Sequence, residues 1–78
     1  MPLQRRISKE TAERLALQDI RVHFPDMESN EVIMAILHEN LWIVVISFRT
    51  RDGREKVWLH GIAAESGELR GHIDGSDS

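Results

Sequence analysis

Apolar residues dominate residues 40–67 and predict two long antiparallel strands. Between them lies Asp52-Gly53, a strong signal for a two-residue hairpin turn with positive φ at both central positions. Such a turn makes Arg51 face Arg54, and counting outward from this pair sets the register of the two strands. The register predicts four further pairs: Phe48 with Val57, Ile46 with Leu59, Val44 with Gly61 and Trp42 with Ala63.

The predicted register divides the hairpin into two faces, because successive side chains of a strand point to opposite sides. The residues of the four predicted pairs form an apolar face, which we expect a helix to cover. The opposite face is charged near the turn and apolar at its far end. Its members are Ile43, Val45, Ser47, Arg49, Lys56, Trp58, His60 and Ile62.

Apolar residues at helical spacing predict one helix, which begins at Ser8 and ends by His23 or Phe24. Ser8 can accept a backbone hydrogen bond from the first turn, and Pro25 disfavours helical geometry in the residue before it. The helical stripe is narrow and mostly small, which suits close docking on a sheet. It consists of Ala12, Leu15, Ala16, Asp19, Ile20 and His23.

Residues 32–37 form a continuous apolar run that periodicity alone does not assign. As a helix, this run would leave a bare two-stranded hairpin, which is marginally stable in water. As a strand followed by a tight turn at Glu39-Asn40, it completes a three-stranded meander, and its β-branched residues favour this interpretation. We therefore predict an α+β fold, in which an N-terminal helix packs on a three-stranded antiparallel β-meander.

The length of 78 residues fits a single small domain. We expect a flexible lead-in over residues 1–6, the folded domain over residues 7–70 and a flexible tail over residues 71–78. The net charge of −3 disfavours a nucleic-acid partner, because phosphate binding rests on clustered lysines and arginines. No apolar run has the length of a membrane span. Without a secretory signal, the chain as written is expected in the cytoplasm, or outside it if it is excised from an exported precursor.

The sequence contains four histidines and no cysteine. His23, His38, His60 and His72 do not follow a zinc-binding spacing. No serine lies in a G-x-S-x-G elbow, and no glycine-rich phosphate loop is present. We therefore predict a protein that is not an enzyme and that has no cofactor or metal. A hydrolase or metal site that uses His60 or the tail is the alternative this pattern supports least.

The second sheet face is the feature that suggests a function. One helix covers only one face of such a sheet, and a solvated sheet face is normally polar, whereas an apolar patch on a small protein usually marks an interface. Trp58 belongs to the residue type most enriched at binding hot spots. We predict that this face binds a protein partner or, alternatively, builds a homodimer that binds a small ligand or serves stability. The predicted partner-binding residues are Ile36, Ile43, Val45, Trp58, His60 and Ile62.

The order of three short motifs resembles the peptidase-propeptide and YpeB-like (PepSY) family. The opening residues 7–17, ISKETAERLAL, are similar to the family's I-S/T-K-E-E-A…A-L start. Residues 62–69, IAAESGEL, are similar to its closing V-D-A-x-T-G-E-V, with Ala63 in place of the usual Asp, and residues 42–48 lie where its central Y-x-V strand falls. The resemblance covers residues 7–70. It implies a helix on an antiparallel sheet and a non-catalytic role, often inhibition or regulation of a peptidase.

Overall fold

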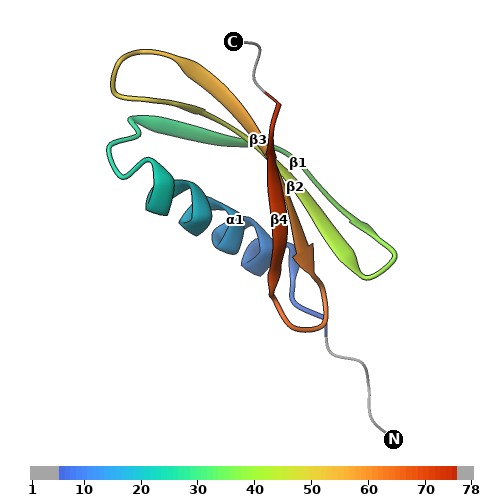
Figure 1. Ribbon diagram of the computed structural model, residues 1–78. Coiled ribbons are helices and arrows are strands. Elements are labelled where there is room, and N and C mark those ends of the chain that lie inside the picture. The colour runs from blue at the N-terminus through green and yellow to red at the C-terminus, as the bar shows by residue number, and fades with distance from the viewer. Residues whose placement is uncertain (1–5, 76–78) are drawn as a thin grey trace, which may run out of the picture.

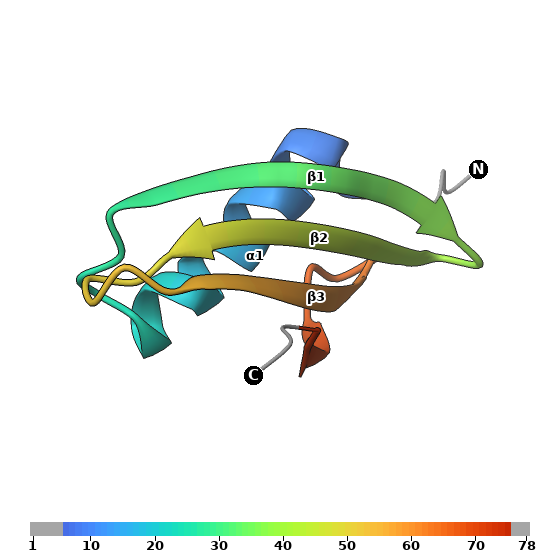
Figure 2. The ribbon, with the colours of Figure 1, turned by 90° about the horizontal axis from the view of Figure 1, so that it is seen from above.

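The computed structural model describes residues 6–75, which form one helix and a four-stranded antiparallel sheet (Figure 1). The elements are α1 (Lys9–His23), β1 (Ser29–His38), β2 (Leu41–Arg49), β3 (Glu55–Ala63) and β4 (Leu69–Asp74). The strands lie side by side in chain order, and Figure 2 shows α1 behind one face of the sheet. The predicted α+β class is confirmed, but the sheet has a fourth strand that the sequence did not predict.

Helix α1 has the predicted bounds, because both of its ends carry local signals. The Ser8 hydroxyl accepts a hydrogen bond of 3.1 Å from the backbone N–H of Thr11. At the other end, the N–H of Phe24 donates to the Ile20 carbonyl at 2.7 Å, and Pro25 follows. Three residues of the predicted stripe are completely buried: Ala12, Ala16 and Ile20. Two of these are alanines, so the helix backbone can lie close to the sheet.

Strand β1 contains the ambiguous run at residues 32–37, so the strand interpretation is confirmed. A bulge interrupts its pairing with β2 between Val32 and Met34. The turn into β2 consists of Glu39 and Asn40, with φ values of 51° and 65°. A two-residue turn with positive φ at both positions, which the sequence predicted for the next hairpin, therefore occurs in this one.

The predicted register of β2 and β3 is wrong by one residue. The N–H of Thr50 donates to the Arg54 carbonyl and the N–H of Gly53 donates to the Thr50 carbonyl, both at 2.9 Å. The loop therefore has three residues, of which only Gly53 has a positive φ, 87°; such loops commonly combine a type I turn with a left-handed residue. The observed pairs are Phe48 with Lys56, Ile46 with Trp58, Val44 with His60 and Trp42 with Ile62.

The shift turns every side chain of β3 to the face opposite to the predicted one. The β2 half of the predicted core is confirmed, because Val44, Ile46 and Phe48 are buried under α1. Its partners from β3 are different. Trp58, His60 and Ile62 lie on the helix side, whereas Val57, Leu59 and Gly61 lie on the outer side. Apolar residues occupy both sides of β3, so the hydrophobic pattern alone does not determine how β3 pairs with β2.

Strand β4 shows that the predicted flexible tail is wrong for residues 71–74. The connection is a tight turn in which the Gly67 N–H donates to the Ala63 carbonyl at 2.8 Å, and Gly67 has the expected positive φ, 75°. Beyond it, Ile73 pairs with Leu59 on β3. Residues 76–78 of the predicted tail and residues 1–5 of the predicted lead-in lie outside the described residues.

Gly53→Ala is expected to lower the free energy of unfolding by about 1–2 kcal/mol, because a left-handed conformation is unfavourable for a residue with a Cβ atom. No heavy atom lies within 4 Å of the Cβ position at Gly53, so backbone strain alone causes the loss. Gly61→Ala is the control, because its Cβ would make ordinary contact with Leu41 at 3.6 Å. Urea denaturation of both variants measures the difference, and equal stabilities would contradict the left-handed conformation of Gly53.

Candidate functional site

The side of the sheet opposite to α1 carries apolar side chains from all four strands. We call this set the outer apolar face. It consists of Met34, Ile36, Leu41, Ile43, Val45, Val57, Leu59 and Ile73. Met34, Ile36 and Ile73 are exposed, and the others are half-buried by their neighbours.

Cross-strand pairing makes the outer apolar face continuous. Its members pair directly across the sheet as Ile36 with Ile43, Met34 with Val45, Val45 with Leu59 and Leu59 with Ile73. Directly paired side chains lie close enough to touch. The face is therefore one apolar surface that extends over the four strands.

The six residues predicted to bind a partner do not share one face. Ile36, Ile43 and Val45 belong to the outer apolar face, as predicted. The other three, on β3, face α1: Trp58 is 6% exposed, and His60 and Ile62 are completely buried. The predicted single surface is wrong for its β3 half, because the three-residue loop shifts this strand by one position.

A group of ionisable side chains lies between α1 and the β3–β4 pair. The Oδ2 atom of Asp19 lies 3.2 Å from Nε2 of His60 and 3.0 Å from Nδ1 of His72. One helical turn further on, Nδ1 of His23 donates to the Asp19 backbone carbonyl at 2.9 Å. We call these four residues, from three different elements, the Asp19 cluster.

Burial affects the charge of His60, one member of the Asp19 cluster. His60 has no exposed surface, and its two ring nitrogens and the Asp19 Oδ2 atom make no hydrogen bond of standard geometry within the described residues. Burial lowers the pKa of His60, the negative charge of Asp19 opposes this effect, and His72 lowers the pKa further. His60 is therefore neutral in the folded protein at neutral pH.

Trp58 packs against the Asp19 cluster on the helix side of the sheet. Its indole stacks on the His72 ring, with the ring centroids 4.5 Å apart and the planes 16° from parallel. It also meets His23 and Phe24 edge to face. Trp58 therefore packs in the core of its own chain and fixes the position of His72 on β4.

The Asp19 cluster does not have the arrangement of a metal site, and its most buried imidazole is closed to a substrate. Among residues 6–75, no group of three or more histidine or acidic side chains is placed to hold a metal ion. A general base must come within hydrogen-bonding distance of its substrate. The His60 ring is fully enclosed, so a substrate cannot reach it while the fold stays closed.

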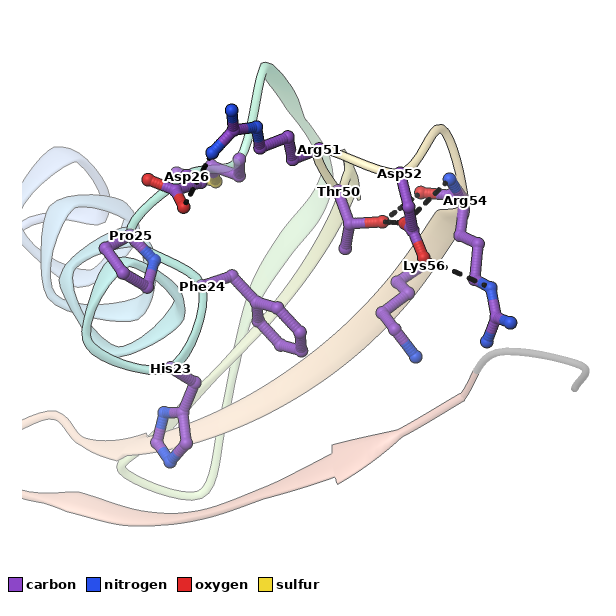
Figure 3. Close-up of a pocket in the computed structure, with 10 residues that line it drawn as sticks. His23, Phe24, Pro25, Asp26, Thr50, Arg51, Asp52, Arg54 and Lys56 are labelled. Atoms are coloured by element: carbon purple, nitrogen blue, oxygen red, sulfur yellow. Dashed lines mark hydrogen bonds and ion pairs between the residues drawn. The ribbon is translucent and has the colours of Figure 1, made fainter.

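A pocket of about 390 Å³ lies between the end of α1 and the tip of the β2–β3 hairpin (Figure 3). The three cations that line it each pair with a carboxylate: Arg51 with Asp26 at 3.8 Å, Arg54 with Asp52 at 3.4 Å and Lys56 with Asp74 at 3.8 Å. Thr50 donates a hydrogen bond to the Asp52 carboxylate, and this bond is the main cause that lowers the pKa of Asp52. These ion pairs leave little cationic charge for an anionic ligand.

The sequence did not reveal the Asp19 cluster, because its members were assigned to unrelated places. Asp19 and His23 were predicted on the helix stripe, His60 on the mixed sheet face and His72 in the flexible tail. The sequence feature that points to this cluster is Asp19, because a carboxylate on a mostly apolar helical stripe requires a buried polar partner. The partner itself could not be identified without β4 and the observed register.

No helix within residues 6–75 is both long and apolar enough to cross a membrane. Comparison of the chain with protein-family models, with curated proteins and with solved structures gives no match. The resemblance to the PepSY family and the functions it implies therefore stay predictions.

Proposed function

We propose that this chain is a non-enzymatic binding module that docks on another protein through its outer apolar face. The continuous apolar surface over the open side of the sheet supports this proposal; Ile36, on the edge strand β1, is 45% exposed. A sheet face that stays in water normally carries polar residues. Regulation of a peptidase is the role that the PepSY resemblance suggests for such docking.

The shape of the molecule makes the β1–β2 end of this face accessible. Figure 1 shows that the turn between β1 and β2 projects away from α1. Leu37, beside this turn and on the helix side of β1, is also exposed. A partner can therefore contact apolar side chains on both sides of the projecting hairpin.

A homodimer is the second candidate, and the β1 edge favours it. Strand β1 has ten residues at the edge of the sheet, and Glu31 is the sole charged side chain between Asn30 and Leu37. Exposed edges normally carry charges or other features that prevent pairing, and the bulge after Val32 protects one part of this strand. Pairing of two β1 strands would extend the outer apolar face across two copies.

Ile36→Glu is expected to weaken association at least about tenfold, because it places a charge within the apolar contact. Val22→Glu is the matched control: Val22 is 73% exposed on α1, away from the outer apolar face. Sedimentation equilibrium at micromolar concentrations measures self-association, and cross-linking in cells followed by isolation of the tagged chain measures binding to other proteins.

The two candidates give different results in this experiment. A wild-type monomer removes the homodimer and leaves the protein partner, whose capture should be lost in Ile36→Glu and kept in Val22→Glu. If both variants associate as the wild type does, the outer apolar face is not the docking surface. Circular dichroism of each variant checks that the fold is intact.

A further inference from the structure

We infer that Asp19, His60 and His72 form an acid-sensitive contact between β4 and α1, and that protonation of both imidazoles releases β4 from the helix. The inference rests on the enclosed contacts between these three side chains. These side chains lie on the helix side of the sheet, whereas the proposed docking surface lies on the other side.

Two imidazoles share one carboxylate oxygen in this site. Both contacts, at 3.2 Å from His60 and 3.0 Å from His72, end on Oδ2 of Asp19. The single negative charge of Asp19 can balance one protonated imidazole but not two. A second proton leaves one positive charge that Asp19 cannot balance, and a charge enclosed without a partner is strongly unfavourable.

The other charged groups around His60 do not provide the missing negative charge. Its ionisable surroundings are Asp19 and His23 from α1, His72 and Asp74 from β4, and Lys56 on its own strand, whereas β2 presents Val44 to it. Asp74 forms an ion pair with Lys56 at 3.8 Å. Asp19 contacts both imidazoles through one carboxylate oxygen.

Strand β4 is the element that can move to relieve the second charge. It has six residues at the edge of the sheet, all of them exposed, and it pairs with β3. His72 is 34% exposed and contacts both Asp19 and Trp58, so it links β4 to the helix layer. Short edge segments open with lower free energies than core strands do. Moving His72 into water separates the two cations without unfolding the core.

Hydrogen exchange of the backbone amides tests this inference. Below about pH 6.5, the protection of the amides in residues 69–74, corrected for the intrinsic exchange rate, is expected to fall by up to about tenfold per pH unit, because the open state binds one more proton. The amides of β1, the other edge strand, should lose less protection than those of β4 over the same range and serve as an internal reference.

Three variants make the test specific. His60→Leu and His72→Gln each remove one imidazole, so the protection of β4 should no longer fall as the pH falls. His72 is partly exposed, so its variant remains usable if His60→Leu does not fold. His38→Gln is the matched control, because His38 lies exposed beside the β1–β2 turn and its loss should leave the wild-type pH dependence.

Three outcomes overturn the inference. The first is protection of wild-type β4 that does not change with pH. The second is a pH dependence that persists in both His60→Leu and His72→Gln. The third is an equal loss of protection in β1 and β4, which would show that acid unfolds the whole domain rather than releasing one strand.

Discussion

Trp58→Ala is expected to lower the free energy of unfolding by about 3–5 kcal/mol, the usual cost of truncating a buried tryptophan. Trp58 is 6% exposed and packs against Phe24, Phe48 and His72. A chain of this length has a total stability of only about 4–12 kcal/mol. The variant should therefore be close to unfolding at room temperature, which urea denaturation followed by circular dichroism would show.

Leu59→Ala is the matched control, because Leu59 is the next residue of β3 and lies half-buried on the outer apolar face. Its truncation removes a partly exposed side chain and should cost about 1 kcal/mol. The two-residue hairpin predicted from the sequence would reverse this order, since it places Leu59 under the helix and Trp58 outside. A larger loss for Leu59→Ala than for Trp58→Ala would contradict the observed register.

The helix and the meander could be predicted because each depends on signals within a few residues. Ser8 and Pro25 mark the ends of α1 independently of its tertiary contacts. The β-branched residues of β1 and the short turn at Glu39-Asn40 are sufficient to indicate a strand followed by a hairpin. The helix has the bounds, and the helix and the first three strands have the order, that local sequence predicts.

The pairing of β2 with β3 could not be predicted, because the deciding contacts involve side chains of the loop. The Thr50 hydroxyl donates to the Asp52 carboxylate, while the Thr50 N–H donates to the Arg54 carbonyl. These bonds stabilise a loop with one residue more than an Asp-Gly turn requires. Hydrophobicity did not correct the error, since Leu59 and Trp58 are both large apolar residues on opposite sides of β3.

The same error explains what was missed at the candidate sites. An apolar second face was correctly expected, and Ile36, Ile43 and Val45 lie on it. The Asp19 cluster, however, requires His60 to face the helix and requires β4 to exist. The glycines and polar residues of the C-terminal segment suggested a loose tail, although Ile73 and its neighbours continue the sheet.

Strand β4 connects the two proposed properties of this protein. His72 belongs to the Asp19 cluster on the helix side of the sheet. The following residue, Ile73, belongs to the outer apolar face, because successive side chains of a strand point to opposite sides. Release of β4 on acidification would therefore remove Ile73 from the docking surface. Association through the outer apolar face is expected to weaken at the pH at which β4 loses its hydrogen-exchange protection.

The domain as a whole is expected to become less stable as the pH falls below about 6.5, the ordinary pKa of histidine. Burial lowers the pKa of His60 in the folded state, so between that lowered value and 6.5 the unfolded chain binds one proton more than the folded chain. Within this window, the free energy of unfolding should decrease by up to about 1.4 kcal/mol for each pH unit of acidification. Above the window this contribution to stability is fully present.

His60→Leu should remove this pH dependence, because an apolar side chain of similar size takes up no proton and leaves Asp19 in contact with His72. His38→Gln, at the exposed β1–β2 turn, should retain it. Urea denaturation between about pH 7.5 and 5 measures both slopes, in a range where ordinary carboxylates stay ionised. A wild-type free energy of unfolding that stays constant over this range would show that the His60 imidazole does not cause the pH dependence. An unchanged slope of this free energy against pH in His60→Leu would show the same.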